Sequence, residues 1–173
     1  MSSLNIVTPR LLLRPVELCD AAATAALVSP AISRELLTWP PQMTVDEARS
    51  KIQDSRRLAA DDLCVHWGIF LKDELTLIGW TGLTRDPLDP SLWWLGYWLG
   101  EAYWRQGYAS EAVRAVLVNR ALAIGAVPVH AFVRTGNRAS IAVLERVGFV
   151  GSDRPATGYR PQCDTEVHFR HDP

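Results

Sequence analysis

The sequence predicts a single α/β domain, and three observations support that prediction. The chain has 173 residues, the size of one domain, and 48% of them are hydrophobic, which is enough to bury a full core. Two apolar runs, 64–71 and 75–83, flank the polar turn 72–74 and indicate a β-hairpin. Residues 95–112 change from the alternating pattern of a strand to the period of a helix, across a short turn that holds glycines.

The chain is expected to begin with an edge strand followed by a helix. Residues 6–14 have the composition of a strand, and Pro15 closes it because proline has no N–H to donate to a sheet. Asp20 is a favourable N-cap for a helix over 21–28, which Pro30 should end.

Two more helices are predicted before the hairpin. A short one is centred on residues 32–37. Thr44 and Glu47 have the spacing of a capping box, in which each side chain bonds the other's backbone N–H, so a helix should run from residue 45 to about residue 60.

The central strand is predicted at 93–99, after the turn-rich link 85–91. Because side chains alternate along a strand, Trp94 and Trp98 should share one face with Gly96.

The helix that follows the glycine turn should lie on the surface of a sheet. Its apolar residues form one stripe, while Glu111, Arg114 and Arg120 are expected to face water. Gly125 should end this helix, and residues 127–134 form the next strand. A loop over 152–162 and a last strand over 163–170 complete the predicted order.

Gly107 marks a place where phosphates bind readily. It has no side chain to keep a ligand away, and it lies where the start of a helix leaves its first backbone N–H groups unpaired.

The residues around Gly107 also carry a family resemblance. Trp104-Arg-Gln-Gly-Tyr-Ala, followed by Ser-Glu-Ala, resembles the acyl-CoA pyrophosphate loop of the GNAT superfamily of N-acetyltransferases, usually Arg/Gln-x-x-Gly-x-Gly/Ala. Trp104 departs from the usual first residue. A branch similar to the ribosomal-protein N-terminal acetyltransferases commonly has Trp there after a Gly-Tyr-Trp strand, and this chain has Gly96-Tyr97-Trp98.

A second motif lies one strand further along the chain. Asn137-Arg-Ala-Ser140, continuing to Gly148-Phe149, resembles the GNAT stretch Asn-x-x-Ser/Ala that ends in Gly-Phe. Each piece alone is also good turn or helix-end chemistry. The two motifs in order, with a helix and a strand between them, favour the family.

The resemblance covers nearly the whole chain and implies the fold in more detail. The GNAT fold is α/β (α+β), with a central mixed, mostly antiparallel twisted sheet of about seven strands and about four flanking helices. The sheet is splayed between strands 4 and 5, here residues 93–99 and 127–134, and the pantetheine arm fills the gap.

The resemblance implies acetyl-CoA as co-substrate, and Arg105 and Arg138 are expected at its phosphates. Backbone groups of the splayed strand would pair with the pantetheine amides, and an amide near Trp98 or Leu99 would stabilise the oxyanion. The expected cofactor-binding residues are Tyr97, Trp98, Leu99, Trp104, Arg105, Gln106, Gly107, Tyr108, Ala109, Ser110, Asn137, Arg138 and Ser140.

The implied reaction is direct transfer of an acetyl group to a primary amine, without a covalent enzyme intermediate. Many GNAT enzymes protonate the leaving thiolate with a tyrosine at the position of Leu144, which this chain lacks, and Ser140 is the nearest substitute. A glutamate that often precedes the Gly-Tyr-Trp strand is replaced by Trp94. Glu101, His66 and Glu35 remain as bases acting through water.

The missing base favours an acceptor of low pKa, most simply a protein N-terminal α-amine. Candidate acceptor contacts are Glu35, Trp39, His66 and Trp94, although core packing is the favoured interpretation for Trp39. Two alternatives stay open: acetylation of a small amine, antibiotic or amino acid, and a catalytically silent acyl-CoA-binding sensor.

Composition argues against several other classes. A net charge of −1 gives no basic footprint for nucleic acid. Three scattered cysteines and four histidines without an i, i+4 pair imply neither a disulfide frame nor a metal site. No apolar run approaches the roughly 20 residues that span a bilayer, and no secretory signal is recognisable, so a cytoplasmic protein is expected. A homodimer is expected only by analogy with the branch.

Overall fold

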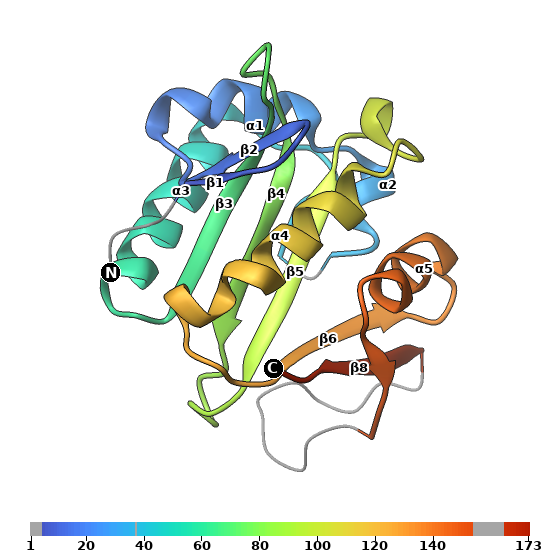
Figure 1. Cartoon of the computed structure of the whole chain (residues 1–173). Helices are drawn as coiled ribbons and strands as arrows, with labels where there is room; N and C mark the ends of the chain where they lie inside the picture. The colour runs from blue at the N-terminus through green and yellow to red at the C-terminus, as the bar shows by residue number, and fades with distance from the viewer. Residues whose placement is uncertain (1–4, 37, 154–164) are drawn as a thin grey trace.

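A single eight-stranded sheet runs through the described part of the chain, which in this computed structural model is residues 5–36, 38–153 and 165–173 (Figure 1). The strand order is β1-β2-β3-β4-β5-β6-β8-β7. The strands are β1 Ile6–Val7, β2 Leu11–Arg14, β3 Cys64–Leu71, β4 Leu77–Arg85, β5 Trp93–Leu99, β6 Val129–Arg134, β7 Val150–Gly151 and β8 Glu166–His171. The α-helices are α1 Ala21–Leu27, α2 Pro30–Ser33, α3 Val45–Ala60, α4 Tyr108–Ala123 and α5 Arg138–Arg146.

The sheet is splayed between β5 and β6, as expected. Every neighbouring pair is antiparallel except this one, which is parallel and pairs only at Trp93 with Val129 and at Trp94 with His130. Beyond those residues the two strands diverge, and Figure 1 shows β5 continuing upward while β6 turns aside toward α5. The predicted mixed, mostly antiparallel α/β fold is confirmed, with eight strands rather than seven.

The extra strands have local causes. Residues 6–14 do not form one continuous strand: Thr8 N donates to Leu11 O at 2.9 Å and Leu11 N to Thr8 Oγ1 at 2.8 Å, which folds the segment into the hairpin β1–β2. The short strand β7, which was not predicted, pairs with β8.

Asp20 does not cap α1 with its side chain, contrary to expectation. Its carboxylate instead accepts two hydrogen bonds from the Arg14 guanidinium, each 2.9 Å long. Pro30 begins α2, for which Ser29 is the N-cap. The Thr44 capping box is present as predicted, and α3 has the predicted bounds.

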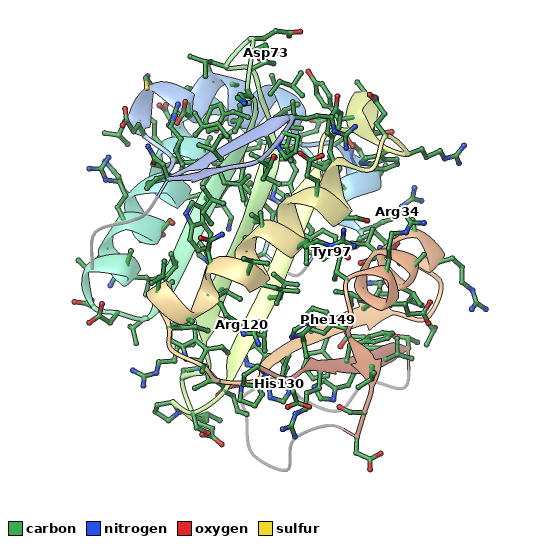
Figure 2. All side chains as sticks on the ribbon, viewed as in Figure 1. Arg34, Asp73, Tyr97, Arg120, His130 and Phe149 are labelled. Atoms are coloured by element: carbon green, nitrogen blue, oxygen red, sulfur yellow. The ribbon has the colours of Figure 1, made fainter. Side chains whose placement is uncertain are left out.

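Two charged residues of α4 that were expected to face water do not. Arg120 is 7% exposed, and its guanidinium donates to Leu117 O and to Asp172 O at the end of the chain (Figure 2). The Glu111 carboxylate accepts hydrogen bonds from Thr8 and Arg10. Only Arg114 of the three is exposed.

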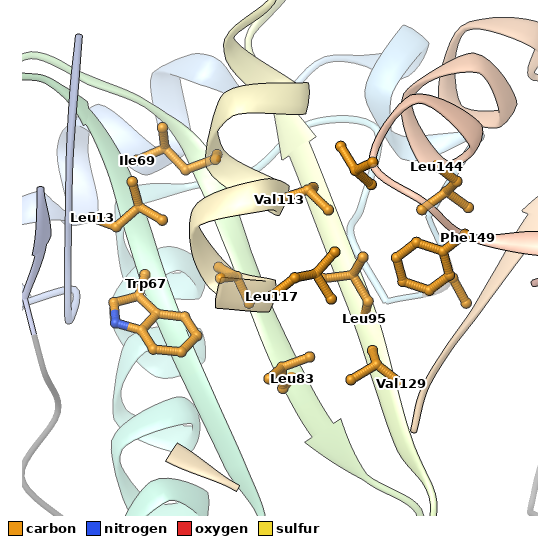
Figure 3. Close-up of a cluster of buried hydrophobic side chains, with 14 of the residues drawn as sticks. Leu13, Trp67, Ile69, Leu83, Leu95, Val113, Leu117, Val129, Leu144 and Phe149 are labelled. Atoms are coloured by element: carbon orange, nitrogen blue, oxygen red, sulfur yellow. The ribbon is translucent and has the colours of Figure 1, made fainter. Parts of the chain in front are cut away.

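The sheet separates two hydrophobic cores. On one face α4 packs on the strands through Val113 and Leu117, and the core continues past β6 to Leu144 and Phe149 (Figure 3). On the other face α1 and α3 pack against Trp80 and Trp98. No helix in the described ranges is both long and apolar enough to cross a membrane.

Candidate active site

A cavity of about 880 Å³ opens where β5 and β6 diverge, within the size range of small-molecule sites. Residues from five elements line it: β5, β6, the N-terminal end of α4, α5 and the segment around α2. The cavity therefore occupies the gap that the splayed sheet leaves open.

The structure brings almost all of the expected cofactor-binding residues to this cavity, with Gln106 as the one that lies outside the lining. The members of that set that line it are Tyr97, Trp98, Leu99, Trp104, Arg105, Gly107, Tyr108, Ala109, Ser110, Asn137, Arg138 and Ser140.

The glycine loop adopts a conformation that only a few residue types accept. Gly107 is the N-cap of α4 with φ of +82°, and Arg105 has φ of +60°. Left-handed backbone costs glycine little but is unfavourable for arginine. Trp104, at the position where the family pattern usually has Arg or Gln, donates its indole N–H to Leu99 O at 2.7 Å and so ties the loop to the end of β5.

Backbone direction along β5 determines which groups are open to the gap. Gly100 N donates to Ile78 O on β4, so the even-numbered positions of β5 turn their backbone groups toward β4. Because these groups alternate along a strand, those of Tyr97 and Leu99 face the gap. The expectation of an open backbone does not hold for Trp98, although Trp98 still lines the cavity.

A pair of hydroxyl groups lies at the cavity wall. The phenol of Tyr97, which is labelled in Figure 2, is 2.7 Å from Ser140 Oγ and donates to Ser140 O at 3.1 Å. Burial raises the pKa of Tyr97 to about 12, and the hydrogen bond with Ser140 opposes only part of that rise. Tyr97 is therefore protonated at neutral pH. The sequence indicated its backbone but gave no signal for the role of its hydroxyl.

Asn137 has a structural task at the start of α5. Its side-chain oxygen accepts from Ser140 N at 3.0 Å, which is an N-cap. The cap fixes Ser140 in the first turn of the helix, opposite Tyr97.

The charge of the cavity is strongly positive. Five of the described lining residues are arginines, and one, Glu35, is a carboxylate. Arg105 and Arg138 were expected there, whereas the other three were not singled out. These are Arg34, Arg134 and Arg146. Such a set suits a ligand that carries several phosphates.

Of the four expected acceptor contacts, Glu35 alone lines the cavity; its carboxylate lies 3.9 Å from Arg34 Nε. Trp39 packs edge-to-face on Trp98, with ring centroids 4.7 Å apart, which supports the core-packing interpretation. Trp94 stacks on Phe132, which does line the cavity.

His66 and Glu101 are not brought to the cavity. The two ring nitrogens of His66 lie within 3.0 Å of the hydroxyls of Ser55 and Thr84. Burial, with the positive charge of Lys51 second, lowers the pKa of His66 to about 4. The Glu101 carboxylate accepts a hydrogen bond from Ser29. Neither residue is positioned to act as the base, so we do not retain them in that role.

Comparison with known proteins identifies the family. Residues 10–150 match the model of the acetyltransferase (GNAT) domain. An uncharacterised N-acetyltransferase of Bacillus subtilis, YoaA, is 30% identical over 142 residues, which are 82% of this chain and 80% of the relative.

Solved structures with the same fold include two that contain coenzyme A or its disulfide. RimL, a ribosomal L7/L12 α-N-protein acetyltransferase crystallised with coenzyme A, has a TM-score of 0.81 at 23% identity, with 98% of each chain covered. Mycobacterium smegmatis RimJ in complex with CoA-disulfide has a TM-score of 0.80 at 20% identity, covering 99% of this chain and 88% of that one. At these identities the likeness shows the fold.

Proposed function

Because this chain belongs to the acetyltransferase (GNAT) domain family and is an N-acetyltransferase, we propose that its acceptor is the α-amine of a protein N-terminus. The observation that carries the proposal is the scarcity of bases at the cavity. Among the described lining residues there is one carboxylate, Glu35, and no histidine.

The amine must be neutral to attack, and its pKa decides how much help it needs. A lysine side chain, with a pKa of about 10.4, is neutral at pH 7 in about one molecule in 2,500, a cost of about 4.6 kcal/mol. An α-amine with a pKa of about 7.8 is neutral in about one molecule in seven. A site without a strong base therefore suits an α-amine. The name of RimL, an α-N-protein acetyltransferase, points to the same acceptor class.

The chain's residues fit acetyl-CoA, which supplies the activated acetyl group. Gly107 and the first amides of α4 suit the diphosphate, with Arg105 and Arg138 beside them. The backbone groups of Tyr97 that face the gap suit the amides of the pantetheine arm, as does the side-chain nitrogen of Asn137.

The Leu99 N–H is the donor that we assign to the oxyanion. It faces the gap beyond the last β5 residue that pairs with β6, so it can donate to a carbonyl oxygen as negative charge develops there. A fixed donor of this kind stabilises the transition state more than the ground state.

Ser140 and Tyr97 are the hydroxyls that we assign to the leaving thiolate. The thiol has a pKa of about 8.5, as a cysteine does, so its departure needs little help. Ser140 Oγ–H gives its proton to the thiolate and regains one from the proton that the attacking amine releases, and the Tyr97 phenol, 2.7 Å away, orients the serine hydroxyl. Glu35, at the rim, is assigned to the ammonium group of the incoming acceptor.

The test uses a matched pair of peptides with acetyl-CoA. The first peptide has a free N-terminus and no lysine; the second has the same sequence with a blocked N-terminus and one added lysine. We expect the first to be acetylated faster by about two orders of magnitude, the ratio of neutral amine. Thiol release gives the rate, and mass spectrometry gives the site. Preference for the lysine peptide, or acetylation of small amines alone, would refute the proposal.

A further inference from the structure

Glu111, in the first turn of α4, is bound by the N-terminal hairpin. Its Oε1 accepts from Thr8 Oγ1 at 2.6 Å and from Arg10 N at 3.0 Å, and its Oε2 accepts from Arg10 Nε at 2.7 Å. The Glu111 side chain is 18% exposed. Burial alone would raise its pKa, but the hydrogen bonds from Thr8 and Arg10 outweigh burial and lower it. The carboxylate is therefore ionised and fixed.

The same Arg10 side chain reaches the glycine loop. Its Nη1 donates to Gln106 O at 3.0 Å, and its guanidinium lies over the Tyr108 ring, 4.4 Å from the centroid. Arg10 thus contacts the residues on both sides of Gly107. Glu111 holds the guanidinium in the orientation that makes these contacts.

The bond to Gln106 O determines the direction of the next amide. The peptide between Gln106 and Gly107 is planar and trans, so its C=O and N–H point in opposite directions. Because the carbonyl points to Arg10, the Gly107 N–H points away from Arg10. Gly107 lines the cavity, whereas Arg10 and Gln106 do not.

We propose that Arg10 is a positioning residue for the cofactor: through the Gln106 carbonyl it orients the Gly107 amide toward the diphosphate of acetyl-CoA. The inference rests on the proposed use of the cavity for acetyl-CoA. This role explains why Gln106, alone of the loop residues expected to bind the cofactor, lies outside the cavity. Its carbonyl is bound by Arg10 on the side of the loop that faces away from the cavity.

Orientation, rather than the charge of Arg10, is the proposed source of the effect. Glu111 neutralises the guanidinium through contacts of 2.7 Å from both Nε and Nη2 to Oε2. The loop also contains Arg105 with φ of +60°, a conformation that needs support from its surroundings.

The experiment compares Arg10→Ala with Arg49→Ala, a control on α3 that also removes an exposed arginine bound to an acidic residue, Asp46, at 2.8 Å. Two ligands are titrated: acetyl-CoA by calorimetry, and S-acetylpantetheine, which lacks the diphosphate, by NMR. We expect Arg10→Ala to weaken acetyl-CoA binding about tenfold or more, and S-acetylpantetheine binding less than about twofold. Arg49→Ala should change neither.

A general loss of structure would weaken both ligands equally, and that result would overturn the inference. Arg10→Lys separates orientation from charge, because one ammonium group cannot bond Glu111 and Gln106 O in the geometry of the guanidinium. Full recovery of acetyl-CoA affinity by lysine would also overturn it. If Arg10→Ala does not fold, Glu111→Gln, which weakens the hold on Arg10, should show the same selective loss.

Failure of the inference and failure of the proposed function give different results. If the wild-type protein does not bind acetyl-CoA, the cofactor assignment is wrong. If the wild type and the Arg10 variants bind acetyl-CoA equally well, the cofactor assignment is supported and the positioning role of Arg10 is wrong.

Discussion

The hydroxyl groups of Tyr97 and Ser140 lie 2.7 Å apart, one carried by β5 and the other by the first turn of α5. Both elements line the cavity, so the pair is a polar link between two parts of its wall. The link places the serine hydroxyl at a defined point of the wall, beside the strand whose amides face the gap.

Ser140→Ala should slow turnover more than it changes cofactor binding. Removal of a proton donor acts on kcat, and we expect a fall of about tenfold, below the usual range for acid catalysis because the thiolate leaves easily. The KM for acetyl-CoA should change little. Steady-state kinetics on a peptide acceptor measures both values, and equal effects on both would remove Ser140 from the acid role.

Tyr97→Phe tests whether the two hydroxyls act together. The variant keeps the ring and loses the O–H that orients Ser140, so kcat should fall by less than in Ser140→Ala. In the double variant the Tyr97 change should add almost nothing, because residues in one hydrogen-bonded pair are not additive. Independent, additive effects on kcat would show that the phenol does not act through the serine.

Gly107→Val should weaken acetyl-CoA binding at least about tenfold, or about 1.4 kcal/mol. The substitution puts a side chain 3.4 Å from Arg10 Nη2 and strains a loop residue with φ of +82°. Gly125→Val is the matched control, because Gly125 has φ of +84°, has open space around it and lies beyond the other end of α4. Calorimetry with both variants measures the effect. Equal affinity in the two would disprove the placement of the diphosphate at Gly107.

Asn137→Ala should have two separable effects. Loss of the N-cap of α5 should lower the free energy of unfolding by about 1 kcal/mol. Cofactor binding should weaken less than in Gly107→Val. Asn137→Asp keeps the capping oxygen and loses the side-chain N–H, so it should restore stability in urea unfolding without restoring affinity. A full return of affinity would mean that Asn137 serves the helix alone.

Stability should rise with pH between about 4 and about 6.5 because of His66. Burial and then Lys51 lower its pKa to about 4, so in this window the unfolded chain binds a proton that the folded protein does not. The contribution is complete above pH 6.5 and is lost as the pH falls. His66→Asn should flatten the dependence of the urea midpoint on pH without removing it, since burial also lowers the pKa of His130 to about 4. An unchanged slope would contradict the assignment.

The sequence predicted best those features that depend on neighbouring residues. The Thr44–Glu47 capping box predicted the start of α3, the apolar run before a polar turn predicted the bounds of β3, and alternation predicted β5. It predicted poorly where a side chain finds a distant partner. Asp20 was predicted to cap a helix, but its carboxylate forms an ion pair with Arg14 instead.

The same limit applied to the site. Both cofactor motifs led to the cavity, because glycine conformation and helix ends are local properties. Trp39 and Trp94 were expected at the acceptor, but whether an aromatic ring lines a cavity or packs behind its wall depends on partners such as Trp98 and Phe132. The Tyr97 hydroxyl and the Arg10 contacts depend on tertiary structure in the same way, and no sequence pattern indicated them.

The sheet has outer edges at β1 and β7, and the divergence of β5 from β6 creates a further edge within it. Exposed edges invite strands of other chains and so promote aggregation. Here α4 and α5 contact one another beside the open half of β5 (Figure 1), so an approaching strand meets helices on the way to it. The pantetheine arm, which is narrower than a β-strand and carries amides of its own, needs less room to reach this edge. The fold thereby keeps backbone groups of β5 available for a ligand at an edge that two helices flank.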